Sequence, residues 1–318
     1  MIFSSIEFIY FFLPPVLAVF ILLKKLRMEN AIIWWLIVAS LTFYIVWSPI
    51  HMILLLASIG ANFLLHKQLL KSPQKSILVF GISLNLLVLG IFKYADFFLV
   101  NFSTISGLDI PELGLILPLA ISFFTFQQIS FLCDTWRGEI IRCDFKKYLL
   151  FVTFFPQLIA GPIVLQKDTI PQFNIASIDK RYTVKLITGI TLFAIGLFKK
   201  IVLADTLAPV AGTVFGLADA GTAVSFESAW VGSLAYTFQI YFDFSGYCDM
   251  ALGLALMFGI KLPINFNSPY KSLSIVEFWR RWHITLSRFL RDYLYIPLGG
   301  NRSGFAGAKG NLIITMLL

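Results

Sequence analysis

The sequence is poor in charged residues and in cysteine. Asp, Glu, Lys and Arg make up only 13% of its 318 residues, whereas a soluble domain carries about 25%. So little charge cannot cover a water-facing surface of this size, which excludes a soluble globular enzyme. Three cysteines are also too few for a secreted domain stabilised by disulfide bonds.

Hydrophobic residues are abundant instead. They make up 58% of the chain, which includes 33 Phe, 11 Tyr and 7 Trp. A chain of this composition would collapse in water, so a disordered protein is excluded as well. The class that remains is an all-α, polytopic membrane protein that lies in the lipid bilayer. Its net charge of +8 then marks cytoplasmic loops, where Lys and Arg collect, and no nucleic-acid partner is expected.

Apolar runs long enough to cross a bilayer recur along the chain. A spanning helix needs about 20 mostly apolar residues. No internal repeat or low-complexity tract divides the chain, so we expect one domain, 1–318. The expected helices cover residues 6–23, 31–47, 50–65, 77–98, 113–132 and 184–203, and a long apolar stretch follows at 230–260.

The charges between these segments alternate in sign. Basic residues follow the first, third and fifth segments, whereas Asp109 and Glu112 follow the fourth. The positive-inside rule therefore predicts that the N-terminus lies outside. We expect a multi-pass protein of the inner (plasma) membrane. Asp205, Asp219 and Glu227 are expected in an outside loop.

Residues 148–165 do not form a simple span. The segment is apolar but is interrupted by Pro156, Gly161 and Pro162, and proline inside a helix removes a hydrogen bond and clashes with the preceding turn. Both flanks are predicted to be cytoplasmic. We therefore expect a re-entrant hairpin, which is tolerated at membrane depth only inside protein or beside a cavity.

Residues 274–295 (SIVEFWRRWHITLSRFLRDYLY) have apolar residues at helical spacing with charges between them. This pattern predicts a helix that lies at the membrane interface or dips into the bundle. Side chains four residues apart can pair along it, namely Glu277 with Arg281 and Arg288 with Asp292.

Two aspartates lie inside the apolar stretch at 230–260. Ionisable groups in a bilayer are costly and therefore suggest function, so Asp243 and Asp249 could line a buried chamber. They could equally form salt bridges to a neighbouring helix, with Lys199 or Lys200 as partners. Gly246 between them suggests a kink or a close helix contact.

His283 is the histidine with the most suggestive surroundings. On a regular helix it shares one face with Trp279 and Ser287, each four residues away. With an unperturbed pKa near 6.5, it could act as a general base, or it could be a structural hydrogen-bonding residue. No metal-ligand spacing, phosphate-binding loop or serine–histidine–acid order accompanies it.

The segment 261–309 carries eight basic and two acidic residues. Contact with anionic lipid head groups on the cytoplasmic leaflet explains this charge. Attraction of a phosphate-bearing donor to a cytoplasmic opening is the alternative, and both can hold.

Motifs spread over the whole chain point to one family. They are residues 265–270 (NFNSPY), 277–287 (EFWRRWHITLS) and 289–302 (FLRDYLYIPLGGNR), supported by 1–5 (MIFSS), 122–130 (SFFTFQQIS), 154–162 (FFPQLIAGP) and 241–247 (YFDFSGY). Together they resemble the membrane-bound O-acyltransferase (MBOAT) family, and more narrowly its alginate O-acetyltransferase branch.

The resemblance implies an MBOAT-type helical bundle, with re-entrant and interfacial helices around a central chamber. It also implies transfer of an acyl group, here acetyl, to a hydroxyl. His283 matches one of the two histidines associated with the family's active site. The second, which the family resemblance marks as the main catalytic histidine, follows an apolar lead-in that matches residues 311–318, where this sequence stops. We therefore expect an incomplete MBOAT domain that is inactive by itself.

The same resemblance assigns roles to residues and partners. His283 is the candidate catalytic residue, and neither a bound cofactor nor a metal ion is expected. The implied acyl donor is acetyl-CoA, and the implied partner is a periplasmic or extracellular acetyltransferase that modifies an exported polysaccharide. Candidates for the chamber or the donor side are Gln157, Asp243, Asp249, Asn267, Trp279, Arg280, Arg281, Ser287, Arg291 and Asp292.

Three alternatives stay open. Within the family, the protein could transfer D-alanyl or another acyl group to a cell-envelope polymer, although residues 295–301 (YIPLGGN) favour the alginate type. A transporter would show an internal repeat with broken helices in corresponding positions, and the interrupted segment 148–165 has no such counterpart. A non-catalytic membrane scaffold is the third.

Overall fold

The computed structural model describes residues 2–140, 142–159, 161–174 and 182–317, and these contain helices but no β-strand. Four helical segments within them are long and apolar enough to cross a membrane: Glu7–Lys25, Pro49–Lys71, Lys75–Ser106 and Tyr182–Asp219. The prediction of an all-α, multi-pass membrane protein is therefore confirmed. Its orientation and its residence in the inner membrane stay predictions.

The chain packs into two compact units. The first comprises Met1–Ile32, Ala160–Pro162 and Asn174–Thr285, and the second comprises Ile33–Ile159, Ile163–Phe173 and Leu286–Leu318. The prediction of a single domain concerns the chain as a whole and stays a prediction.

The first unit is built on long helices. It contains η1 (Glu7–Phe12), α1 (Leu13–Lys25), α9 (Tyr182–Phe198), η3 (Lys199–Ala204), α10 (Asp205–Asp219), α11 (Phe226–Met257), η4 (Pro269–Lys271) and α12 (Ile275–Arg281). Helices α9, η3 and α10 follow one another without a break, so the prediction that Asp205, Asp219 and Glu227 lie in a loop is wrong: Asp205 and Asp219 belong to α10, and Glu227 belongs to α11. Their placement outside the membrane stays a prediction. The helix continues because the Lys200 ammonium, one turn earlier, lies 2.7 Å from the Asp205 carboxylate.

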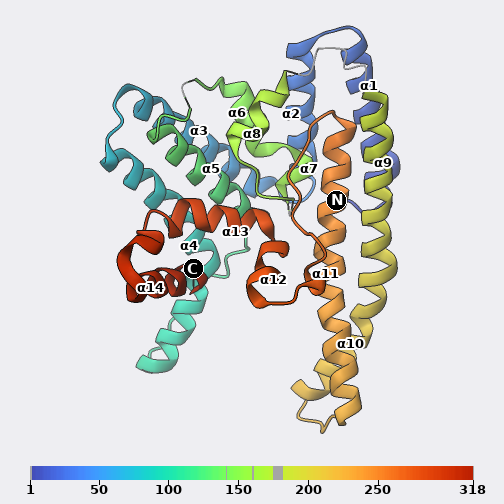
Figure 1. Cartoon of the computed structure of the whole chain (residues 1–318), viewed down its shortest axis with the longest axis vertical. Coiled ribbons are helices and arrows are strands. Elements are labelled where there is room, and N and C mark those ends of the chain that lie inside the picture. The colour runs from blue at the N-terminus through green and yellow to red at the C-terminus, as the bar shows by residue number, and fades with distance from the viewer. Residues whose placement is uncertain (1, 141, 160, 175–181, 318) are drawn as a thin grey trace. The chain divides into compact units, whose positions relative to one another are not determined.

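Helices α9 and α11 lie side by side (Figure 1) because glycines face one another between them. A Cβ added to Gly246 would lie 2.8 Å from the Gly196 carbonyl oxygen, and one added to Gly253 would lie 2.5 Å from that of Gly189. Small residues let helix backbones approach closely where lipid supplies no hydrophobic driving force. The predicted close helix contact at Gly246 is confirmed.

We expect Gly253→Ala to destabilise the first unit by about 1–3 kcal/mol, the usual cost of overpacking. The new methyl group would meet the backbone of Gly189 and Phe193, which cannot rotate away. Thermal unfolding of the purified protein in detergent measures the effect. Gly212→Ala on α10 is the matched control, since a Cβ there has no atom within 4 Å. Equal unfolding temperatures for the two variants would contradict the close contact.

The second unit holds α2 (Glu29–Ile45), whose first residues belong to the first unit, and a set of shorter and longer helices. These are α3 (Pro49–Lys71), α4 (Lys75–Ser106), α5 (Ile121–Trp136), α6 (Phe145–Thr153), α7 (Phe155–Leu158), α8 (Gln166–Thr169), η2 (Ile170–Phe173), α13 (Ile284–Leu290), η5 (Arg291–Tyr295), η6 (Gly300–Ser303) and α14 (Gly304–Leu317). The first two residues of α13, Ile284 and Thr285, belong to the first unit. The expected fifth span, 113–132, begins too early, because α5 starts only after Ala120, which adopts a left-handed conformation (φ +63°).

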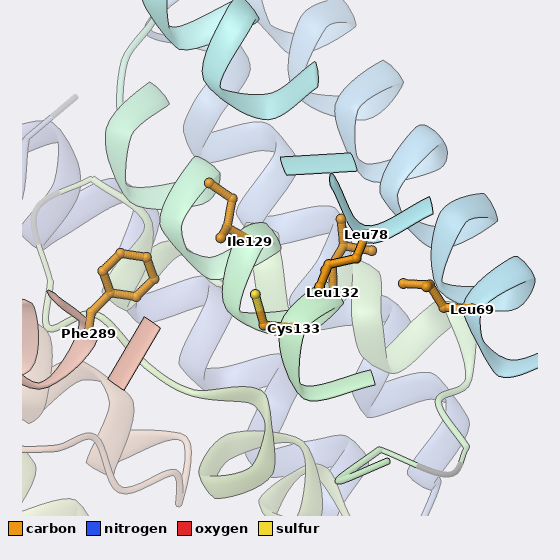
Figure 2. Close-up of a cluster of buried hydrophobic side chains, with 6 residues drawn as sticks. All are labelled: Leu69, Leu78, Ile129, Leu132, Cys133 and Phe289. Carbon is orange, nitrogen blue, oxygen red and sulfur yellow. The ribbon is translucent and has the colours of Figure 1, made fainter. Parts of the chain in front are cut away.

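A buried apolar cluster joins α3, α4 and α5 to α13 (Figure 2). Phe289 on α13 lies 4.8 Å, centroid to centroid, from Phe126 on α5. This contact attaches the segment that follows His283 to the helices of the second unit. The cluster consists of Leu69, Leu78, Ile129, Leu132, Cys133 and Phe289.

The interruption predicted near Pro156 is present. Helix α6 ends at Thr153, and α7 restarts at Phe155 with Pro156 in its first turn, where proline is tolerated. The Phe155 N–H, which α6 cannot satisfy, donates to the Ser40 hydroxyl at 3.1 Å. The side chains of α6 and α7 from Tyr148 onward are buried. A re-entrant course through the membrane stays a prediction.

Candidate active site around His283

His283 lies at a break between two helices. Helix α12 ends at Arg281 and α13 begins at Ile284, and His283 has a left-handed backbone conformation (φ +44°). The predictions that 274–295 is one helix and that Trp279, His283 and Ser287 share a helix face are therefore wrong. The structure replaces the missing helical hydrogen bonds with partners from an earlier segment.

That earlier segment is 265–267, which runs beside the break. The Asn267 N–H donates to the Arg281 carbonyl at 3.0 Å, and the Ile284 N–H donates to the Asn265 carbonyl at 2.9 Å. These two bonds lie on either side of His283. They hold the backbone in a conformation that histidine adopts less readily than glycine.

The imidazole of His283 is held by the side chain of Asn265. Its Nδ1 lies 3.1 Å from Asn265 Oδ1, which also accepts from the Thr285 N–H at 3.2 Å and the Thr285 hydroxyl at 2.9 Å. Asn265 is only 1% exposed, and its Nδ2 donates to Cys248 Sγ on α11 at 3.3 Å. The histidine thus belongs to a buried polar cluster within the first unit.

Aromatic rings surround this cluster. Phe244 on α11 lies edge-on to the His283 ring, with centroids 4.9 Å apart and an interplanar angle of 83°. Trp282 turns the other way and packs against Phe266 and Phe278. The Tyr270 hydroxyl, beside them, donates to the Thr237 carbonyl at 2.8 Å. The rings restrict the rotation of the imidazole and reduce its contact with water.

This burial has an electrostatic consequence. It disfavours the imidazolium and lowers the pKa of His283 to about 4. The ring is therefore neutral at pH 7 and keeps a lone pair that can accept a proton. A neutral imidazole inside a partly dry pocket is the form that general base catalysis needs.

Asp243 and Asp249 are both paired with lysines. Lys199 Nζ lies 2.6 Å from the Asp249 carboxylate, and Lys200 Nζ lies 2.7 Å from that of Asp243. The salt-bridge interpretation of these aspartates is thus confirmed, with the two lysines that the sequence offered. The chain forms a π-helix at η3, where both lysines are placed. A role in lining a chamber stays a proposal.

The remaining candidates of the first unit lie on or near α12. Arg281 binds Glu277 at 2.7 Å, as the four-residue spacing predicts, and donates to the Asn267 carbonyl at 3.4 Å. The side chains of Asn267, Trp279 and Arg280 are exposed. Glu277 also accepts from the Leu273 N–H at 2.9 Å, and these contacts lower its pKa. They anchor the start of α12 rather than the imidazole.

The other candidates belong to the second unit. Arg291 forms two hydrogen bonds to the adjacent Asp292, at 2.7 and 3.3 Å, and Arg288 lies 3.8 Å from Asp292, again as predicted. Gln157 is 1% exposed and donates to the Phe151 carbonyl, while Ser287 is half-buried. Among the described residues, no group of His, Cys, Asp and Glu could hold a metal ion.

Asn265, Thr285 and Phe244 were not among the candidates. Asn265 and Thr285 lie inside the motifs 265–270 and 277–287, so the signal was present in the sequence. Spacing could not connect them to His283, because Asn265 is 18 residues away and meets the histidine only through the fold.

Comparisons with known proteins show the family of this chain. A model of the family described as "MBOAT, membrane-bound O-acyltransferase family" matches residues 138–318. The whole chain is 45% identical to the "Peptidoglycan O-acetyltransferase" of Helicobacter pylori and 42% identical to the "Probable alginate O-acetylase AlgI" of Pseudomonas aeruginosa. It spans 66% and 61% of their lengths, which is less than two thirds.

A more distant relative widens the range of acyl groups. The chain is 31% identical to the "Teichoic acid D-alanyltransferase" of Bacillus subtilis, over 58% of this chain and 47% of that protein. The match to the family and the identities over the full chain lead to one conclusion: this chain belongs to the membrane-bound O-acyltransferase family.

Proposed function

We propose that the full-length protein takes an acetyl group from acetyl-CoA on the cytoplasmic side of the membrane and passes it across the membrane toward the O-acetylation of an exported cell-envelope polysaccharide. The observation that carries the proposal is the neutral, half-buried imidazole of His283 within a chain 40–45% identical to relatives named as O-acetyltransferases or O-acetylases. The basic segment 261–309 supports a phosphate-bearing donor, because positive charge raises the local concentration of anions.

Transfer of the acetyl group from a thioester to a hydroxyl requires one proton acceptor. The acceptor's oxygen attacks the thioester carbonyl, a C–O bond forms, the C–S bond breaks, and the hydroxyl proton must leave. The imidazole of His283 takes that proton, or orients the group that does, and the proton passes on to the departing thiolate. Asp243 and Asp249 shape the chamber around this step, and Arg280 and Arg281 lie on the donor side.

A periplasmic or extracellular acetyltransferase is the proposed partner, which receives the acetyl group and modifies the polymer. The second candidate is transfer of D-alanyl to a polymer, which the 31% identity to a teichoic acid D-alanyltransferase supports. The two differ in donor and not in the proton transfer at His283.

Membrane vesicles that contain the full-length protein test the proposal. Radiolabelled acetyl-CoA does not cross membranes, so inside-out vesicles should acetylate the polymer, whereas sealed right-side-out vesicles should do so only after permeabilisation. We expect that the protein does not transfer labelled D-alanine from its carrier. Activity of right-side-out vesicles without permeabilisation would contradict the cytoplasmic donor, and use of D-alanine in place of acetyl would favour the second candidate.

A further inference from the structure

We propose that Asn265 is a positioning residue that keeps the proton of neutral His283 on Nδ1, so that Nε2 presents its lone pair to the reacting hydroxyl. The proposal rests on the proposed role of His283 in proton transfer. It adds that Nε2 is the nitrogen that accepts the proton and that Asn265 determines this.

The argument starts with the orientation of the Asn265 side chain. A backbone N–H can only donate, and the Thr285 N–H points at one atom of the Asn265 amide, 3.2 Å away. That atom must therefore be the oxygen and not the nitrogen. The Thr285 hydroxyl, 2.9 Å from the same atom, donates to it as well. The amide NH₂ then faces Cys248 Sγ at 3.3 Å, a weak acceptor.

The orientation of the amide determines the tautomer of the histidine. Asn265 Oδ1 lies 3.1 Å from His283 Nδ1, and an amide oxygen has no proton to give. Nδ1 must therefore carry the hydrogen. In a neutral imidazole the other nitrogen, Nε2, is then the acceptor.

The backbone prevents the ring from leaving this arrangement. The Asn265 carbonyl accepts from the Ile284 N–H at 2.9 Å, so Asn265 binds both the backbone next to His283 and its ring. Phe244, edge-on at 4.9 Å, limits rotation of the imidazole. A second residue that orients the catalytic base in this way is the usual arrangement for activated histidines.

Asn265, the hydrogen-bond partner of His283, is uncharged, and this affects which protonation state of the imidazole is favoured. Several titratable groups of the packed elements have other partners. Cys248 on α11 receives the Asn265 amide, Asp249 pairs with Lys199 at 2.6 Å, and on α12 Arg281 pairs with Glu277 at 2.7 Å. An amide therefore fixes the tautomer without stabilising the imidazolium, as a carboxylate would.

The tautomer can be measured without any activity assay. The chain contains only three histidines, His51, His66 and His283, so ¹⁵N-histidine labelling gives few ring signals, and His283→Gln assigns the relevant pair. At pH 7 we expect a protonated Nδ1 and an unprotonated Nε2. The opposite pattern, or exchange averaging between both tautomers, would overturn the proposal.

Asn265→Asp tests the same point through pH dependence in the full-length protein. A carboxylate at Nδ1 stabilises the imidazolium and raises the pKa of His283, so activity should be lost at a higher pH than in the wild type. A purely structural role for Asn265 would lower kcat/KM at every pH without moving the pH at which activity is lost on acidification. Asn101→Asp, the same change at an exposed position of α4, should leave this pH unchanged.

The outcomes separate this proposal from the proposed function. Thr285→Ser keeps both donors to Asn265 Oδ1, the backbone N–H and the hydroxyl, and should retain the wild-type pH profile. Thr285→Val removes the hydroxyl donor. If His283 variants are inactive but Asn265→Asp does not shift the pH at which activity is lost, the positioning role is wrong and the proposed function stands. If His283 variants keep full activity, the proposed function itself fails.

Discussion

His283→Asn in the full-length protein is expected to lower acetyl transfer by about 10²–10⁴-fold, the usual contribution of a general base. Asparagine tolerates the left-handed backbone conformation (φ +44°) that this position requires. The substitution therefore removes the imidazole and leaves the break between α12 and α13 intact. Incorporation of labelled acetyl into polymer by membrane vesicles, normalised to the amount of folded protein, measures the loss.

His51→Asn is the matched control for this variant. His51 lies in the first turn of α3 in the second unit, and its Nδ1 lies 2.9 Å from the Ser48 hydroxyl. It has no part in the proposed chemistry, so transfer should stay close to that of the wild type. Wild-type transfer by His283→Asn would refute the assignment of His283 as the proton acceptor or as the residue that orients it.

Asp134→Ala is expected to destabilise the second unit by about 3 kcal/mol, within the range for loss of one partner of a buried charged network. Asp134 on α5 is 1% exposed, and its carboxylate accepts from the Tyr293 hydroxyl at 2.8 and 2.9 Å. Arg137 lies 3.8 Å away. Because Tyr293 belongs to η5, 159 residues along the chain, this network attaches the segment after α13 to α5.

Thermal unfolding in detergent should resolve the contributions within this network. Asp134→Asn keeps an acceptor for Tyr293 and should lose clearly less stability than Asp134→Ala. Tyr293→Phe should be destabilising in the wild type and nearly neutral in the Asp134→Ala background, because its partner is already gone. Additive losses in the double variant would show that the two side chains are energetically independent.

Local patterns in the sequence were predictive wherever the interaction itself is local. The pair Glu277–Arg281 forms at 2.7 Å because residues four apart are neighbours on one helix turn. The interruption beside Pro156 occurs because proline cannot continue the helix that precedes it. The pairing of Asp243 and Asp249 with Lys199 and Lys200 was one of two open interpretations, since only burial in an apolar environment was foreseeable.

The surroundings of His283 could not be obtained in this way. Helical spacing predicted an unbroken helix through Trp279, His283 and Ser287, because periodicity reports which residues are apolar and not which backbone bonds are made. The chain breaks at His283 because 265–267 offers two backbone partners there. Likewise, the continuation of α9 into α10 past Asp205 depends on where Lys200 finds its partners.

By itself, the sequence determined the membrane class, most of the helix positions and the family, because hydrophobic composition and short motifs are properties of neighbouring residues. The tertiary structure alone decided the histidine's chemistry. Asn265, 18 residues away, reaches Nδ1 only after folding, and burial lowers the pKa of His283 to about 4 only when Phe244 and the rings around it have packed. Burial and hydrogen-bond geometry depend on contacts between distant segments, and no spacing along the chain encodes them.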